Sequence, residues 1–396
     1  MSGNSAEKSK IHRLRELFLV SLKLGLLSFG GPTAHIGYFH NEYVKKKRWL
    51  DEKAFADLVA LCQFLPGPAS SHVGMGIGMM RAGIIGGLVS FMGFTLPSSI
   101  LLVLFAIFLK GTNISSQGWL HGLKIVVVVI VLQAVLDMGK KLASQRITAT
   151  IALLSAATVL IWNQGAVQIF VILIASVFGW WFLKKKTDNM VTAFSIDIDR
   201  KTSTIALFLF FLLLVLLPLL SYYNGSVSLQ LFDKFFRSGS LVFGGGHVVL
   251  PLLEKEFVPQ EWLSKESFLA GYAAAQAVPG PLFTFSSYLG AVIGGWKAAL
   301  MATIAIFLPA FLLIAGTLPF WEKLRKKSAV SGMLAGVNAA VVGLLLAALY
   351  NPIFTSAIQS GKEFAIGCIL FGTSSFWKAS PWMIVLLGAA AGYLFL

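Results

Sequence analysis

Gln63–Pro68 reads QFLPGP, and Gln276–Pro281 reads QAVPGP in the other half of the chain. Proline has no backbone N–H and glycine permits positive φ, so each Pro-Gly-Pro stretch should end one helix and start another. Both stretches lie within long apolar sequence. They therefore predict a pair of helix breaks inside apolar segments, and this feature decides the fold.

The similarity between the halves extends well beyond this stretch. Lys23–Gly31 and Arg237–Gly245 share the pattern basic-x-Gly-x-x-x-Phe-Gly-Gly, and an acid follows each at Glu42 and Glu256. Further matches pair Trp49-Leu50 with Trp262-Leu263, Gly86-Gly87 with Gly294-Gly295, and Leu96-Pro97 with Leu308-Pro309. Matched motifs over this length predict a tandem of two homologous halves.

The composition excludes several classes of protein. Hydrophobic residues make up 57% of the 396, charged residues 12%, and the mean hydropathy is +0.79. A soluble domain carries about 25% charged residues, so a soluble enzyme is excluded. The net charge of +15 is assigned to cytoplasmic loops beside anionic lipid, and no nucleic-acid partner is expected. Two cysteines provide no disulfide framework or thiolate metal cluster, and we expect neither a metal site nor a cofactor.

The apolar runs indicate many membrane segments, because a spanning helix needs about 20 apolar residues. Candidate segments cover residues 17–40, 55–80, 84–109, 121–138, 147–162, 166–183, 203–221, 229–252, 268–290, 292–318, 330–350, 363–374 and 381–396. We therefore expect an all-α polytopic membrane protein built from two inverted-topology repeats with broken or re-entrant helices.

Loop charges give the expected orientation of the two repeats. The connector at Lys45–Arg48 is basic in the first half, whereas in the second half the basic loop is Lys323–Lys327 and comes later in the repeat. By the positive-inside rule the repeats are inverted. The expected divisions are a cytoplasmic N-terminal tail at 1–16, a first repeat at 17–183, a basic cytoplasmic linker with a linking transmembrane helix (203–221) at 184–228, and a second repeat at 229–396.

The segment 17–40 is expected to re-enter the membrane. The basic N-terminal tail and Lys45–Arg48 both look cytoplasmic, although this apolar segment lies between them. A hairpin that turns at Gly30–Pro32 explains this, and the Pro-Gly-Pro segment could fold back in the same way before Arg81. The alternative is two full spans with an atypically basic external connector, and the topology of everything downstream is the same in both cases.

The four matched breaks indicate where a substrate would bind. Irregular backbone inside a membrane occurs where it is buried in protein or lines a cavity. A helix that starts after a break presents free N–H groups and a positive dipole end, which suit an oxyanion. The candidate substrate-binding residues are Lys23, Phe29, Gly30, Gly31, Pro32, Gln63, Pro66, Gly67, Pro68, Ser70 and Ser71 in the first half, and Arg237, Phe243, Gly244, Gly245, Gln276, Pro279, Gly280, Pro281 and Thr284 in the second.

Each of these residues also has a structural interpretation. The glycines could serve only close helix packing. Lys23 and Arg237 could extend to the headgroup level rather than to the middle of the membrane. Gln63 and Gln276 could pack between helices. The two matched acids, Glu42 and Glu256, are candidate proton-coupling groups, or they are solvated or paired with neighbouring lysines.

The chain carries no Walker A loop, so transport would have to be secondary. It also carries no evident nucleophile triad, metal-ligand cluster or paired buried acids, so we expect that it is not an enzyme.

Two halves that each hold a Phe-Gly-Gly motif, a Pro-Gly-Pro motif and a downstream Leu-Pro resemble the chromate ion transporter family in its long form. The resemblance runs from about Leu17 to Tyr350. It implies a carrier in the cytoplasmic membrane that exports chromate, with sulfate as a mimic of the substrate. Gly246 departs from the pattern because it stands where the first half has Pro32.

Two other functions are kept as alternatives, a proton-coupled importer of sulfate or another oxyanion, and a passive anion channel. The expected partners are a chromate-like or sulfate-like oxyanion, the lipid bilayer and a second copy of the chain in a homodimer.

Overall fold

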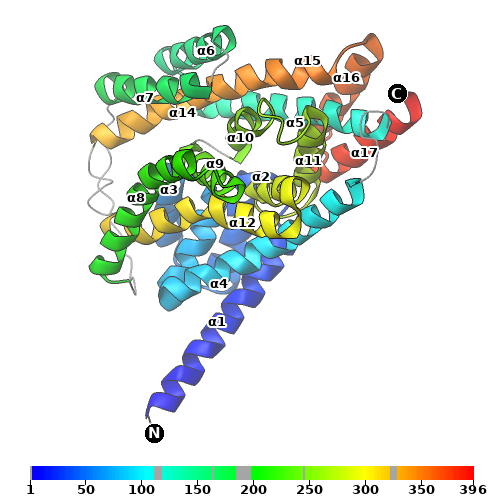
Figure 1. The fold of residues 1–396 in the computed structure, drawn as a ribbon. Coiled ribbons are helices and arrows are strands. Elements are labelled where there is room, and N and C mark those ends of the chain that lie inside the picture. Colours follow the sequence, from blue (N-terminus) through cyan, green and yellow to red (C-terminus); the bar gives the residue numbers. More distant parts are fainter. Residues whose placement is uncertain (1, 111–117, 163–164, 184–197, 244–245, 322–327) are drawn as a thin grey trace.

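The computed structural model describes residues 2–110, 118–162, 165–183, 198–243, 246–321 and 328–396. They form helices joined by turns, and no β-strand occurs among them (Figure 1). The first half contains α1 (Ser2–Leu27), α2 (Gly31–Phe39), η1 (His40–Lys46), α3 (Glu52–Phe64), α4 (Ala69–Leu109), α5 (Gly118–Leu142), α6 (Arg146–Ile161) and α7 (Gly165–Phe182). The rest contains α8 (Arg200–Asn224), α9 (Val227–Leu241), η3 (Gly246–Val248), α10 (Val249–Phe257), α11 (Lys265–Ala277), η4 (Leu282–Thr284), α12 (Phe285–Thr317), η5 (Leu318–Phe320), α14 (Ser328–Ala348), η6 (Leu349–Phe354), α15 (Thr355–Ala357), α16 (Gly361–Ser375) and α17 (Pro381–Phe395).

The two halves repeat the same order of elements around the linking helix α8. A helix that ends at the Phe-Gly-Gly motif is α1 in one half and α9 in the other, and the helices before the Pro-Gly-Pro motif are α3 and α11. Long helices follow as α4 and α12, and three further helices complete each half, α5, α6 and α7 against α14, α16 and α17. This order confirms the all-helical, two-repeat architecture.

The fold is that of a multi-pass membrane protein. Among the described residues, five stretches are long and apolar enough to cross a bilayer, namely Ala69–Leu109, Gly118–Leu142, Arg200–Tyr223, Leu282–Phe320 and Ser331–Ala357. Only 22% of the most apolar window of α8 is buried inside the protein. The remaining apolar surface of this helix therefore suits contact with lipid rather than with water.

The Phe-Gly-Gly break of the first half forms the tip of a helical hairpin. The chain turns at Ser28–Gly30 and returns through α2 and η1 alongside α1. Lys23 Nζ donates to Glu42 Oε2 at 2.8 Å, and Lys47 Nζ donates to Glu16 Oε1 at 2.8 Å. These two contacts tie the arms together, so the N-terminal segment and the basic connector lie at the same end of the hairpin.

The second half repeats this hairpin with α9 and α10. Arg237 Nη1 lies 3.5 Å from Glu256 Oε1, and Lys234 Nζ donates to Glu256 Oε2 at 3.0 Å. The sequence-based expectation that segment 17–40 folds back rather than continues is confirmed, and the second half repeats the arrangement. About eleven residues, or roughly 16 Å of helix, lead from the expected membrane boundary at Leu17 to the first tip, which is half of a 30 Å hydrocarbon core.

The Pro-Gly-Pro motifs form a second hairpin in each half. Asp51 caps α3 by accepting from the N–H of Ala54, and Ser264 caps α11 by accepting from the N–H of Ser267. α3 then runs against the first arm of α4, because Trp49 before α3 stacks under Arg81 at the far end of that arm. The structure thus confirms that the Pro-Gly-Pro segment folds back before Arg81.

A tight turn divides each of the long helices α4 and α12 into two arms. Ala82 and Gly83 have φ of −149° and +64°, and Gly294 and Gly295 have φ of −144° and +73°. The structural counterpart of Gly294-Gly295 is therefore Ala82-Gly83. The sequence match of Gly86-Gly87 with Gly294-Gly295 was wrong. Gly86 instead lies in the second arm, where it lets the arms pack closely, since a β-carbon at Gly78 would collide with its backbone.

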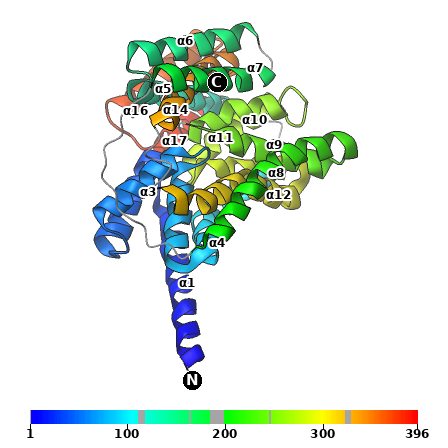
Figure 2. The same cartoon turned by 90° about the vertical axis from the view of Figure 1, so that its left-hand side faces the viewer.

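The two halves pack through their long helices. α4 lies against α12, α5 against α16 and α17, and α14 against α6 and α7. Figures 1 and 2 show α1 extending from this body, with the N-terminus at its far end. Because corresponding helices make corresponding contacts across the interface, the buried core is shared between the repeats.

Candidate substrate site at the hairpin tips

The tips of the hairpins exchange backbone hydrogen bonds between the halves. The N–H of Gly67 donates to the carbonyl of Val242 at 2.6 Å, and the N–H of Gly280 donates to the carbonyl of Ser28 at 2.9 Å. Each Pro-Gly-Pro tip of one half therefore docks on the Phe-Gly-Gly tip of the other. The two contacts are equivalent under the repeat, as an approximate two-fold relation between the halves requires.

Positive φ angles explain why glycine stands at these tips. Gly67 and Gly280 have φ of +123° and +98°, while Gly30 and Gly31 have φ of +92° and +77°. Such angles cost residues with a β-carbon free energy, so a glycine is needed where the backbone turns and donates across the interface. Gly244 and Gly245, the other candidate glycines, lie outside the described residues.

The Leu-Pro motifs of the long helices support the tips. Ser98 follows the first motif, and its Oγ is 2.8 Å from the place that a β-carbon on Gly280 would occupy. Ala310 follows the second and stands in the corresponding position, 3.4 Å from the place of a β-carbon on Gly67. All three matched motifs, which are separated by tens of residues in sequence, meet at one interface.

Gly246, which stands where the first half has Pro32, lies close to that proline in the structure. A β-carbon at this position would lie 3.7 Å from Pro32 Cγ and 3.4 Å from Leu282 Cβ. The two equivalent positions thus face each other across the interface.

The remaining motif side chains frame the tips. Phe29 and Phe243 are partly buried next to them, as is Pro66, whereas Pro68 and Pro281 are buried. Gly30, Gly31 and Pro32 follow Phe29 at the first turn, and Pro279 lies buried beside Gly280.

Hydroxyl groups gather where the helices restart after the tips. Ser70 and Ser71 are each 2% exposed, and Thr284 is fully buried with its Oγ1 donating to the carbonyl of Pro281 at 2.7 Å. Several buried hydroxyl oxygens of the tips and their supports have no hydrogen-bond partner in the described structure: Ser28 Oγ, Ser71 Oγ, Thr95 Oγ1, Ser99 Oγ and Ser286 Oγ. Unpaired buried groups of this number call for a ligand, ion or water, and hydroxyl donors suit an oxyanion.

The candidate cations are each paired with the candidate coupling acid of their own half. Lys23 is bound to Glu42, whose side chain is only 8% exposed, and Lys46 lies 3.6 Å from the same carboxylate. Arg237 bonds to Glu256 and, more closely, to Asp233. Within the described residues, these contacts join each cation to the acids of its own half and do not join Lys23 to Arg237.

The two glutamines lie in different surroundings. Gln63 is exposed, whereas Gln276 Nε2 lies 3.5 Å from His247 Nδ1, which in turn is 2.8 Å from the Tyr272 hydroxyl. Sequence reasoning missed Tyr272 as a partner of this group. It also missed Asp233, although the spacing of four residues from Arg237 is the signal for an ion pair along a helix.

The family model described as Chromate transporter matches residues 15–180 and 229–393. The chain belongs to this family. The match falls on both halves, and the family is one of transporters rather than of enzymes. No solved structure matches the chain.

Relatives cover nearly the whole chain. An uncharacterized transporter of Methanocaldococcus jannaschii is 29% identical over 387 residues, 96% of this chain and 94% of its own. The chromate transport protein of Pseudomonas aeruginosa is 28% identical over 393 residues, with 96% and 92% covered. The chromate transport protein of Cupriavidus metallidurans is 27% identical over 355 residues, with 88% and 84% covered.

Proposed function

We propose that this chain is a secondary carrier that exports chromate across the cytoplasmic membrane by alternating access, with the substrate bound at the four hairpin tips. The observation that carries the proposal is the reciprocal hydrogen bonding of Gly67 with Val242 and of Gly280 with Ser28. It places irregular backbone from both repeats at one interface, which is where secondary transporters bind substrate. The choice of chromate as the substrate rests on relatives that are named chromate transport proteins.

The same proposal includes the inverted topology. The hairpins in the first half return to the side from which they came, so the spanning part comprises the second arm of α4, then α5, α6 and α7. With α8 the number of crossings is odd, and the second repeat starts on the opposite side. We keep the divisions at residues 1–16, 17–183, 184–228 and 229–396, with a cytoplasmic N-terminus.

Membrane energetics favour export. A dianion that leaves a cell with a negative interior releases about 4.6 kcal/mol per 100 mV of potential. That free energy sustains a gradient of about three decades at roughly 1.4 kcal/mol per tenfold. Import of the same ion needs coupled cations, and the acids available at the tips, Glu42 and Glu256, are already engaged in ion pairs.

Substrate contact in this proposal starts from the unpaired donors of the tips. Lys23 and Arg237 then act as cations that exchange a carboxylate for the dianion, and Lys46 is placed to keep Glu42 neutralised when Lys23 turns away. Ser70, Ser71 and the two glutamines supply further hydroxyl and amide groups, and Thr284 joins them when its hydroxyl leaves the carbonyl of Pro281. Sulfate has the same shape and charge as chromate and should compete for these donors.

Counterflow in proteoliposomes tests the carrier. Vesicles loaded with unlabelled sulfate should accumulate labelled chromate transiently above its equilibrium level, because a carrier exchanges one anion for the other. A passive anion channel gives no such overshoot. A proton-coupled importer gives uptake that follows external acidity and is lost in Glu42→Gln or Glu256→Gln.

The site assignment is tested by Lys23→Ala and Arg237→Ala. Each should raise the KM for chromate, and the double variant should deviate from the product of the single effects if both cations serve one ligand. If each variant changes the KM only slightly and the double variant shows the product of the single effects, neither residue belongs to the site.

A further inference from the structure

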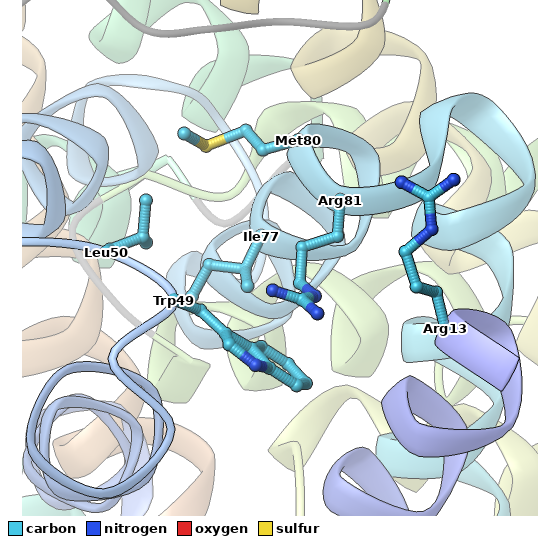
Figure 3. Close-up of a pocket in the computed structure, with 6 residues that line it drawn as sticks. All are labelled: Arg13, Trp49, Leu50, Ile77, Met80 and Arg81. Atoms are coloured by element: carbon cyan, nitrogen blue, oxygen red, sulfur yellow. The ribbon is translucent and has the colours of Figure 1, made fainter. Parts of the chain in front are cut away.

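A pocket of about 260 Å³ lies away from the hairpin tips, next to the base of the first hairpin. It is lined by Arg13, Trp49, Leu50, Ile77, Met80 and Arg81 (Figure 3). These residues come from α1, from the connector between η1 and α3, and from the end of the first arm of α4. A water molecule in the liquid occupies about 30 Å³, so the pocket has room for a tetrahedral oxyanion with part of its hydration shell.

The pocket carries an excess of positive charge. Two arginines line it, and Figure 3 shows the Arg81 guanidinium turned toward Trp49 with the Arg13 guanidinium to the right of it. The acid nearest to Arg81 is Glu16 at 3.7 Å, and Lys47 holds that carboxylate more closely at 2.8 Å. Lys47 and Arg81 therefore share one carboxylate, and in the described part of the chain Arg13 forms no ion pair of its own.

Arg81 is held in a fixed position. Its Cζ lies 3.9 Å from the centroid of the Trp49 ring, and its Nε is buried without a hydrogen-bond partner in the described structure. A guanidinium group binds oxyanions through a planar fork of N–H donors, and stacking on an aromatic ring orients this fork. The unpaired Nε thus indicates that a ligand or water completes the group.

The second half lacks this pocket's cations. The match of Phe29 with Phe243 places Val227 at the position of Arg13, and the match of the helix turns places Ile293 at the position of Arg81. Trp262-Leu263 nevertheless keeps the counterpart of Trp49-Leu50. The repeat therefore retains the apolar wall in both halves and the arginines in one.

We propose that Arg13 and Arg81 form a loading site for tetrahedral oxyanions such as chromate and sulfate, on the face where export begins. This inference rests on the proposed function for its direction. In an inverted repeat the equivalent positions, Val227 and Ile293, lie at the opposite face of the membrane. The anion therefore meets a cationic binding site on the face where it enters and no such site on the face where it leaves. A local positive potential raises the anion concentration at the entry, and salt screens this effect.

Transport kinetics in everted vesicles test the loading site. Arg13→Gln should raise the KM for chromate about fivefold to tenfold, leave the maximal rate within about twofold, and weaken the dependence of KM on salt. Arg81→Lys, which keeps the charge and loses the fork, should raise KM by a smaller factor. Arg15→Gln is the matched control, since it removes the same charge from the same exposed helix without lining the pocket.

Direct binding keeps the test independent of transport. Full-length protein in nanodiscs of phosphatidylcholine should bind labelled sulfate more weakly in Arg13→Gln than in Arg15→Gln. Addition of phosphatidylglycerol identifies the occupant, because a headgroup phosphate offers the same chemistry. If the affinity for sulfate is the same with and without phosphatidylglycerol, the pocket binds a free oxyanion. If phosphatidylglycerol displaces sulfate, the pocket is a lipid site and the loading site is refuted.

The outcomes separate the two proposals. If wild type moves chromate and Arg13→Gln has the KM of Arg15→Gln, the loading site is refuted and the carrier stands. A lower maximal rate with unchanged KM shows a structural role and refutes it as well. If wild type moves no chromate, the proposed function fails, and weaker sulfate binding in Arg13→Gln still establishes the pocket as an anion site.

Discussion

At the scale of single residues, the matched cations and acids form the same bond in both halves. Lys23 with Glu42 and Arg237 with Glu256 have equal separations in sequence, and both pairs tie the arms of a hairpin. The carboxylate of Glu42 is almost fully buried, whereas the side chain of Lys23 is 46% exposed. Loss of the ion pair should therefore cost more free energy when it leaves the buried Glu42 carboxylate unpaired than when it leaves the exposed Lys23 unpaired.

This asymmetry predicts unequal effects of two substitutions. Lys23→Met should cost about 1–2 kcal/mol, less than the 3–5 kcal/mol for a fully buried pair, because Lys46 remains near the carboxylate and Lys23 is half exposed. Glu42→Gln should cost less than about 1 kcal/mol, since the lysine it releases is half exposed rather than buried. Thermal unfolding of both variants in the same detergent shows which substitution lowers the stability more. A greater loss from Glu42→Gln would contradict it.

The pH dependence of stability should include a contribution from Glu16. The hydrogen bond from Lys47 lowers the pKa of Glu16 from its usual 4.5, helped by the charges of Lys47 and Arg81 and opposed by burial. Because the folded pKa is depressed, this stabilisation is present above the unfolded pKa and is lost as the pH falls through the folded value. The melting temperature of wild type should therefore drop more steeply below pH 4.5 than that of Glu16→Gln. Parallel curves in this range would exclude the contribution.

At the scale of elements, the hairpin tips depend on backbone conformation. Gly280→Ala places a β-carbon at φ of +98° and 2.8 Å from Ser98 Oγ, and strain in this region costs about 1–3 kcal/mol. We expect a lower melting temperature and slower chromate transport. Gly139→Ala in α5 is the control, because no atom lies within 4 Å of the added carbon and alanine favours a helix by about 0.5–1 kcal/mol. Equal behaviour of the two variants would show that the tip tolerates side chains.

The positions of the breaks could be predicted from the sequence, because proline and glycine act on the backbone locally. The fold-back of segment 17–40 could also be predicted, from the basic residues on both sides of it. The pairing of the tips could not, since the bond from Gly280 to Ser28 joins backbone atoms of different halves. The turn at Ala82-Gly83 was misplaced because one of its two residues is not glycine.

The ion pairs show a different limit of sequence reasoning. Lys23 and Glu42 were both recognised as candidates, yet their mutual distance depends on the hairpin that brings α1 and η1 together. The pocket at Arg81 was missed for the same reason. Its lining residues belong to three elements, and Trp49 was noticed only as a marker of the repeat.

At the scale of the whole molecule, the docked tips that we propose as the substrate site are built from both repeats. Each half contributes one Phe-Gly-Gly tip and one Pro-Gly-Pro tip, and neither half completes a docked pair alone. Rotation of one repeat against the other would change access to the tips from the two faces. In the proposed function, the membrane potential then drives a dianion outward without ATP.

The most direct test is chromate accumulation in everted membrane vesicles that contain this protein, energised by respiration and measured with sulfate as competitor. The account predicts saturable uptake that sulfate inhibits and that falls to the level of vesicles without the protein when the potential is collapsed. Uptake that survives collapse of the potential, or no difference from vesicles that lack the protein, would contradict potential-driven oxyanion export.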